Sequence, residues 1–165
     1  MSIVLTNSLY NSNFLRQNLV QLVRTYPFLN IQIISYSILG SPLYVVKLGK
    51  GSNQVFYSAS IHANESITTN LLMKFIEDYC IAYTNNSSLY GYSIRSLFNS
   101  SSIYIMPMVN PDGVDLVNGF FSPDNSIYNS FKSIANNYPN IPFPFGWKAN
   151  FNGVDLKNYQ PFVIH

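Results

Sequence analysis

Two side chains with metal-binding chemistry stand three residues apart in the segment His62-Ala63-Asn64-Glu65. Imidazole nitrogen and carboxylate oxygen are ordinary zinc ligands, and a set without thiolate is typical of catalytic rather than structural zinc sites. Three helical steps return a side chain to nearly the same face, so His62 and Glu65 can share one ion if the backbone turns between them. A catalytic zinc takes three protein ligands and keeps one position for water. The segment therefore predicts part of a catalytic zinc site and leaves the third ligand to be found.

The same residues have a plain structural interpretation. His62 can be a hydrogen-bonded histidine at the end of a strand, and Glu65 can be a carboxylate favoured by the dipole of a following helix. Short motifs also match by accident, so the four residues do not decide between the two interpretations. The second histidine, His165, is the last residue of the sequence and is better interpreted as a terminal residue than as a ligand.

The motif lies between a predicted strand and a predicted helix. Alternation over residues 55–62 indicates a strand that ends at His62. A helix is expected from just after Glu65 to about Ala82. Its apolar stripe is predicted to consist of Ile67, Leu71, Leu72, Phe75, Ile76 and Tyr79. The carboxyl ends of strands in α/β sheets are where crevices form, so this junction is a suitable place for a site.

The rest of the chain alternates between strands and helices. A helix is predicted over residues 11–26, with Ser12 or Asn13 at its start. The other predicted elements are a hairpin of strands 31–38 and 43–48, a strand over 102–109, a turn over 110–113 and a helix over 127–135. This alternation is typical of an α/β domain. Gly-Val-Asp-Leu occurs twice, at 113–116 and 153–156, but two copies do not make a repeat protein.

Composition limits the function further. A chain of 165 residues suits one domain, and 47% hydrophobic with 10% charged residues indicates a globular protein. The net charge of +2 comes without a basic run, which argues against nucleic acid or an anionic membrane surface as partner. The single cysteine, Cys80, is expected to be buried and excludes an internal disulfide. With no signal peptide and no apolar run long enough to span a membrane, we expect a soluble protein, for which the cytoplasm is favoured and export by another route stays open.

Three segments in order resemble the zinc metallocarboxypeptidase family, the M14 peptidases. They are residues 55–65, ending in the His62 to Glu65 motif, residues 104–113, and Trp147 to Asn150 followed by 153–156. The pattern is most similar to the bacterial branch that cleaves γ-D-glutamyl-diamino-acid bonds in cell-wall peptides. The resemblance implies a mixed β-sheet flanked by helices, Zn²⁺ as cofactor, and a peptide substrate such as a peptidoglycan stem peptide.

Carried over residue by residue, the resemblance makes His62 and Glu65 zinc ligands. Lys148 falls near the position where many members have an arginine that polarises the scissile carbonyl. A lysine supplies positive charge there without a bidentate fork, and a solvated surface lysine is an equal alternative. After residues 153–156 the family pattern has Asn-Arg to hold the substrate carboxylate, whereas this chain reads Lys157-Asn158, in which Asn158 is at best a shifted remnant.

The family's third ligand, a histidine, and its general-base glutamate lie tens of residues beyond the point where this sequence stops. Residues 1–165 are therefore expected to be the N-terminal part of one M14 catalytic domain, truncated, with apolar surface left uncovered by missing strands. A zinc peptidase that hydrolyses an amide bond in a peptide is the leading hypothesis. The alternatives are an inactive fragment that binds a peptide or a partner, and the functionless product of a disrupted gene.

Overall fold

A mixed four-stranded sheet forms one layer of the molecule. The computed structural model describes residues 2–157. The strands are β1 (Asn30–Tyr36), β2 (Pro42–Gly49), β3 (Asn53–Ser58) and β6 (Ser101–Met106), in the order β1-β2-β6-β3. The β1–β2 and β2–β6 pairs are antiparallel, whereas β3 pairs with β6 in parallel. The predicted fold class, a mixed sheet with flanking helices, is confirmed.

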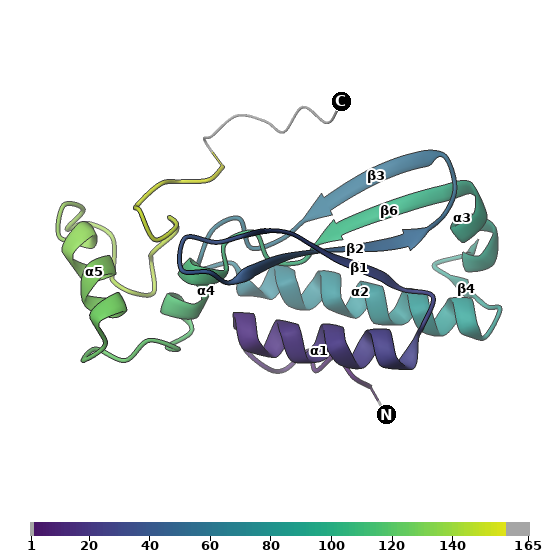
Figure 1. Ribbon diagram of the computed structural model, residues 1–165, viewed down its shortest axis with the longest axis horizontal. Helices are drawn as coiled ribbons and strands as arrows, with labels where there is room; N and C mark the ends of the chain where they lie inside the picture. The colour runs from purple at the N-terminus through teal and green to yellow at the C-terminus, as the bar shows by residue number, and fades with distance from the viewer. Residues whose placement is uncertain (1, 158–165) are drawn as a thin grey trace.

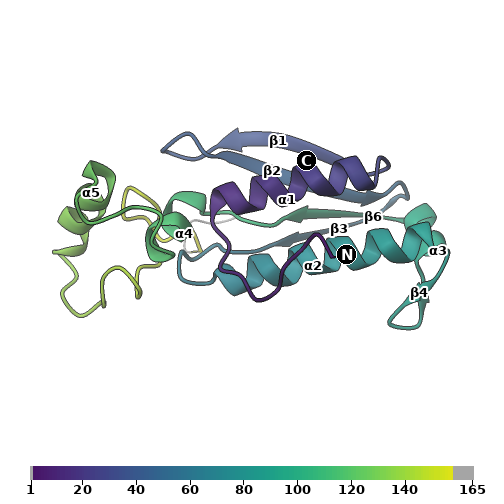
Figure 2. The ribbon, with the colours of Figure 1, turned by 90° about the horizontal axis from the view of Figure 1, so that it is seen from below.

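Two long helices form the second layer. Helices α1 (Ser12–Thr25) and α2 (Ser66–Thr84) lie side by side across one face of the sheet (Figures 1 and 2). The buried core between the layers includes Leu15, Leu19, Leu22, Val46, Leu48, Met73, Ile76, Ile103 and Ile105. Within residues 2–157 no helix lies on the opposite face (Figure 1), so that face is open there.

Helix α1 is capped by the residue that precedes both predicted caps. Its N-cap is Asn11, whose side-chain oxygen accepts a hydrogen bond of 2.8 Å from the backbone N–H of Phe14. The predicted capping chemistry was right, but the choice of Ser12 or Asn13 was wrong, because Asn11 already satisfies the first free N–H groups.

Most of the predicted apolar stripe of α2 packs inward, with Ile76 and Tyr79 buried and Leu72 and Phe75 partly buried against the core, but its first members do not. Ile67 and Leu71 are each 69% exposed, while Thr69 and Met73 are fully buried. The buried carboxylate of Glu77 accepts hydrogen bonds from Ser2 and from the backbone N–H of Ile3. The buried side of this helix therefore extends from the predicted stripe toward Thr69, Met73 and Glu77, and the apolar pattern did not reveal the polar residues on it.

Strand β3 ends at Ser58, so the prediction that His62 ends a strand was wrong. Ser60 has a φ of +47°, a left-handed conformation that a strand cannot continue through. The chain then turns through residues 59–65 before α2 begins. His62 therefore stands in a loop between the strand and the helix.

The predicted turn at 110–113 is instead the start of a short helix, α4 (Pro111–Val117). Asn110 caps it by accepting a 3.1 Å hydrogen bond from the Gly113 N–H, and Pro111 occupies the first turn, where its missing N–H costs nothing. Asn-Pro-Asp is thus a helix-start signal here, and it was misread as a turn.

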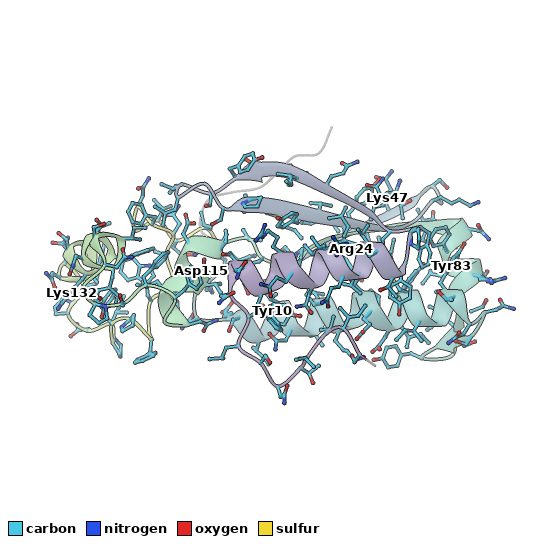
Figure 3. All side chains as sticks on the ribbon, turned by 60° about the horizontal axis from the view of Figure 1, so that its bottom comes forward. Tyr10, Arg24, Lys47, Tyr83, Asp115 and Lys132 are labelled. Carbon is cyan, nitrogen blue, oxygen red and sulfur yellow. The ribbon has the colours of Figure 1, made fainter. Side chains whose placement is uncertain are left out.

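Two buried carboxylates hydrogen-bond helix α4 to the rest of the fold. Asp115 accepts hydrogen bonds of 2.7 and 2.6 Å from the N–H and hydroxyl of Ser12, and Figure 3 shows it beside the start of α1. Asp112 accepts bonds from the Ser37 hydroxyl and the Leu39 N–H in the β1–β2 turn. Burial raises the pKa of Asp115, and the two bonds from Ser12 oppose that rise.

The predicted helix at 127–135 is confirmed as α5 (Ser126–Ala135). Helix α3 (Ile94–Ser100) and the short strands β4 (Ser88–Leu89) and β5 (Tyr92–Ser93) were not predicted. In Figure 1, α5 lies beyond α4, away from the main sheet. A second buried cluster there joins Ala63, Leu116, Phe131, Ala135 and Trp147. Because Ala63 follows His62, the loop that carries His62 is anchored in this second core.

Candidate metal centre

His62 and Glu65 face one another, as the sequence predicts for two ligands of one ion. His62 Nδ1 lies 2.9 Å from Glu65 Oε1. The His62 side chain is 11% exposed and that of Glu65 is 46% exposed, so the pair stands at the surface with its imidazole embedded. The loop that connects β3 to α2 therefore presents one nitrogen and one carboxylate oxygen to the same point.

The other imidazole nitrogen faces a residue that sequence reasoning missed. His62 Nε2 lies 3.4 Å from Oδ1 of Asp155. Asp155 belongs to the second Gly-Val-Asp-Leu segment, whose repetition was noticed but given no role. A carboxylate on one nitrogen fixes the ring orientation and leaves the other nitrogen for a metal. Because Glu65 and Asp155 occupy opposite edges of the ring, they cannot both join His62 around one ion.

The two Gly-Val-Asp-Leu segments have different structures. The first lies in helix α4, and the second lies in a turn held by Asn150. The Asn150 side-chain oxygen accepts hydrogen bonds of 3.0 Å from the N–H groups of both Asn152 and Val154. Gly153 has a φ of +75°, which glycine adopts without steric cost. This turn places Asp155 beside the imidazole.

Hydrogen bonds join the segment 147–149 both to the His62 loop and to the N-cap residue of α4. The Ala63 N–H donates a 3.0 Å hydrogen bond to the carbonyl of Lys148, and Asn110 Nδ2 donates one of 3.0 Å to the carbonyl of Ala149. A Cβ at Gly113 would lie 2.7 Å from the Ala63 Cβ and 2.8 Å from the Ala149 oxygen, so only glycine permits this approach. The three segments that suggested the family thus meet at one place.

Glu65 is also the N-cap residue of α2, but its side chain forms no capping hydrogen bond. A capping carboxylate would turn back to the free N–H groups of the first helical turn. Instead, the Glu65 carboxylate points to His62. Its direction is the one that metal binding requires.

Lys148 is exposed, and its backbone lies against the His62 loop through the Ala63 hydrogen bond. The structure thus places the backbone of Lys148 beside the candidate centre. The two other residues considered from the sequence, Asn158 and His165, lie outside residues 2–157.

The donors fit zinc in kind and fall short in number. One neutral imidazole nitrogen and one carboxylate oxygen are typical of a catalytic zinc. Within residues 2–157 no cluster of three or more histidine, cysteine, aspartate or glutamate side chains is arranged to hold a metal ion. The third ligand that a catalytic zinc needs is therefore not supplied by this part of the chain.

A family model described as zinc carboxypeptidase, Peptidase M14, matches residues 15–160. The chain belongs to this family. The match includes both the His62 to Glu65 loop and Asp155, so the family assignment covers the whole candidate centre.

Two bacterial M14 relatives align with nearly all of the chain. It is 42% identical over 153 residues to γ-D-glutamyl-L-diamino acid endopeptidase 1 of Lysinibacillus sphaericus, covering 92% of this chain and 38% of that protein. It is 36% identical to the uncharacterized protein YqgT of Bacillus subtilis, covering 93% of this chain and 40% of that one. The chain thus spans about two-fifths of the length of these relatives.

Solved carboxypeptidase-fold structures agree with the assignment. Thrombin-activatable fibrinolysis inhibitor superposes with a TM-score of 0.65 at 19% identity, covering 91% of this chain and 32% of that one. Carboxypeptidase A of Helicoverpa armigera superposes with a TM-score of 0.53 at 18% identity, covering 70% and 27%. At these identities the likeness shows the M14 fold alone. Between residues 2 and 157, every helix is too short or too polar to cross a lipid bilayer.

Proposed function

We propose that this chain is the N-terminal part of a zinc-dependent peptidase domain that hydrolyses an amide bond in a peptide. His62 Nδ1 and Glu65 Oε1 are two of the zinc ligands. One observation carries the proposal: the two atoms lie 2.9 Å apart while the other imidazole nitrogen faces Asp155, so the ring is held with Nδ1 directed to the metal position. The placement of both residues in a family match supports it.

Each nearby residue has a separate task in this proposal. Bound zinc supplies Lewis acidity, which polarises a carbonyl and lowers the pKa of water. Asp155 accepts a hydrogen bond from the Nε2–H of His62. It thereby favours the tautomer in which Nδ1 is unprotonated and has its lone pair available for a metal. Lys148 adds positive charge at the rim, where a substrate carbonyl or carboxylate gains from it.

A cell-wall peptide is the proposed substrate class. Its support is the printed activity of the Lysinibacillus relative, an endopeptidase for a γ-D-glutamyl-L-diamino acid bond, together with 42% identity across the candidate centre. In this chain the substrate is proposed to be a peptidoglycan stem peptide that carries such a bond.

Catalysis requires groups that residues 2–157 do not bring together. A third zinc ligand and a general base are needed, and a positioned base contributes about 10²- to 10⁴-fold. We propose that further polypeptide, equivalent to the remaining three-fifths of the relatives' length, supplies both. The chain without it is expected to bind zinc weakly and to hydrolyse peptides slowly.

The sheet edge favours a second candidate function, binding of a partner polypeptide without catalysis. Val55, Phe56 and Tyr57 on β3 are between 45% and 50% exposed, and residues 53–58 carry no charge. An uncharged edge strand with apolar side chains is a template for another strand. An apolar groove of about 350 Å³ beside it is lined partly by Tyr57 and by Leu71 of α2. A separate polypeptide that adds a strand beside β3 is the proposed occupant.

Zinc binding tests the first proposal. The purified chain is titrated with Zn²⁺ against a chromogenic chelator, and His62→Ala and Glu65→Ala are compared with Asp124→Asn, an exposed control. Weak binding that both loop variants abolish and the control retains supports the ligand assignment. Binding that is unchanged in His62→Ala contradicts it.

A hydrolysis assay distinguishes the proposed peptidase from the proposed binding function. A synthetic L-alanyl-γ-D-glutamyl-diaminopimelate peptide is incubated with Zn²⁺ and the chain, alone and mixed with a separately produced C-terminal part of the Lysinibacillus relative. Hydrolysis that appears only in the mixture, and is lost with His62→Ala, supports the peptidase. Complex formation without hydrolysis supports the binding module.

A further inference from the structure

The hydroxyl groups of Ser60, Thr68 and Thr69 form a hydrogen-bond network next to the backbone of Glu65. The Ser60 hydroxyl lies 2.7 Å from that of Thr69, and the Thr68 hydroxyl donates a 2.7 Å hydrogen bond to the carbonyl of Glu65. The Thr69 hydroxyl donates to the carbonyl of Pro107, just after β6. Ser60 and Thr69 are almost completely buried. The network therefore connects the ends of two strands to the first turn of α2.

Counting protons fixes the direction of the network. Each hydroxyl has one proton to donate. Thr68 gives its proton to Glu65 and Thr69 gives its proton to Pro107, so Ser60 must be the donor in the Ser60–Thr69 bond. The longer 3.2 Å contact from the Ser60 hydroxyl to the Glu65 carbonyl shares that same proton. With the Thr68 hydroxyl also accepting a bond from the Ser60 N–H at 2.9 Å, every hydroxyl has a partner.

The network replaces the cap that Glu65 does not provide. An N-cap side chain ordinarily holds the first turn of a helix by accepting a hydrogen bond from one of its free N–H groups. Here the Glu65 carboxylate is directed to His62, and the helix start is held instead through the Glu65 carbonyl, which accepts from both the N–H and the hydroxyl of Thr68. The carboxylate is thus free to face a metal while the backbone beneath it stays fixed.

Ser60 accepts a backbone conformation that glycine would adopt more easily. Its φ of +47° is in the left-handed region, which is sterically unfavourable for a residue with a Cβ. Glycine would remove that strain but would also remove the hydroxyl. A strained serine, buried and donating to Thr69, indicates that the hydroxyl itself is used.

We propose that Ser60, Thr68 and Thr69 are positioning residues that aim the Glu65 carboxylate at the metal position. This inference rests on the proposed assignment of Glu65 as a zinc ligand. The Thr68 and Ser60 hydroxyls contact the Glu65 carbonyl, and Thr69 holds Ser60 in place. Removal of one hydroxyl therefore lets the first turn of α2 shift and separates Glu65 Oε1 from His62 Nδ1. Changes to groups that orient metal ligands typically lower metal affinity about 10- to 100-fold.

The test compares variants that keep and remove the hydroxyl. Thr69→Val removes it with little change of shape, and Thr69→Ser restores it. Ser60→Gly removes the hydroxyl and relieves the backbone strain. Zn²⁺ affinity of each purified chain is measured by chelator competition, and hydrogen exchange of the amides of residues 65–69 is measured without metal. Thr84→Val, which removes a hydroxyl bonded to the Cys80 carbonyl at the far end of α2, is the matched control.

We expect Thr69→Val and Ser60→Gly to bind Zn²⁺ at least about 10-fold more weakly than the wild-type chain, with faster exchange at residues 65–69. Thr69→Ser and Thr84→Val should retain wild-type affinity. Equal affinity and exchange in Thr69→Val and Ser60→Gly overturn the inference. If Thr69→Val does not fold, the Ser60→Gly and Thr69→Ser comparison decides. A wild-type chain that binds no Zn²⁺ refutes the proposed function, while the metal-free exchange still tests the network.

Discussion

Asp155 Oδ1 lies 3.4 Å from His62 Nε2, on the edge of the imidazole opposite Glu65. A residue from the last described turn of the chain thus holds the ring of a residue from the loop after β3. The arrangement makes the direction of Nδ1 depend on a carboxylate that is distant in sequence.

Replacement of Asp155 should weaken metal binding, and by an amount that depends on the residue introduced. Asp155→Ala removes the acceptor and is expected to lower Zn²⁺ affinity about 10- to 100-fold, whereas Asp155→Asn keeps one oxygen acceptor and should lower it less. Chelator competition measures both, with the exposed Asp124→Asn as control. Identical affinities for Asp155→Ala and the wild-type chain would show that the ring orientation has another cause.

Gly113→Ala should destabilise the fold although alanine is the better helix former. In an open helix the change would stabilise by about 1 kcal/mol. Here the new Cβ would lie 2.7 Å from that of Ala63 and 2.8 Å from the Ala149 oxygen, and overpacking of this kind costs about 1–3 kcal/mol. Urea unfolding measures the difference.

Gly91→Ala is the comparison for Gly113→Ala. At Gly91 a Cβ meets nothing within 4 Å, so only its φ of +86° opposes alanine. We expect the Zn²⁺ affinity to fall in Gly113→Ala and to stay constant in Gly91→Ala, because only Gly113 touches the loop that carries His62. Equal stability of Gly113→Ala and the wild-type chain would mean that α4 can move away at no cost.

The sequence predicted the sheet and the long helices because their signals are local. Apolar alternation and 3.6-residue spacing report directly on strands and helices, as for α1 and β2. The predicted stripe of α2 was wrong at Ile67 and Leu71, and it missed Glu77, which is buried against Ser2 and Ile3, two residues distant in sequence. Short-range periodicity contains no information about such partners.

The same distinction between local and distant partners explains why only part of the candidate site was predicted. His62 and Glu65 are three residues apart, so their pairing is a property of one loop and could be inferred. Asp155 reaches His62 only through the tertiary fold. The duplicated Gly-Val-Asp-Leu pattern marked the residue, but only the structure distinguishes the copy that holds α1 from the copy that holds the imidazole.

Glu77 should make the free energy of unfolding depend on pH in the acidic range. Burial would raise the pKa of its carboxyl, but the hydrogen bonds from Ser2, the Ile3 N–H and Lys74 together outweigh that effect and lower the pKa. The carboxylate therefore contributes its full stabilisation above the unfolded pKa of about 4.3, and this contribution is lost as the pH falls through the lower folded pKa.

Glu77→Gln tests this dependence. At pH 7 the variant should be less stable by about 1–3 kcal/mol, because it loses charge-assisted hydrogen bonds to the N-terminal segment. Urea unfolding at a series of pH values should show the difference shrinking as the pH falls below 4. Asp124→Asn, at an exposed position, should follow the wild-type curve. A difference that grows toward low pH would contradict the assignment.

Cys80 should be chemically inert in the folded chain. Desolvation by burial raises the pKa of its thiol to about 12, with a further contribution from Glu77. Thiolate is the reactive form, so a disulfide reagent at pH 8 is expected to modify the native chain far more slowly than the chain in urea. Rapid modification of the native chain would indicate local opening of α2.

A charge on the sheet edge should reduce self-association. Lysine on an edge strand opposes pairing with another strand. Val55→Lys is therefore expected to shift the chain toward the monomer in concentration-dependent light scattering, compared with the wild-type chain. Val23→Lys, which changes a partly exposed residue of α1, is the control and should behave as the wild type does. Equal association of all three would show that β3 is not the surface involved.

The long sequence separation between His62 and Asp155 also has a consequence for folding kinetics. Contacts between distant residues form late, because the loop they close must lose entropy before the contact forms. The Glu65 pair is complete once α2 has started, whereas the Asp155 contact must wait for the turn at Asn150. During synthesis the imidazole is therefore made well before its orienting carboxylate, and metal that arrives early meets a ring that is still free to rotate.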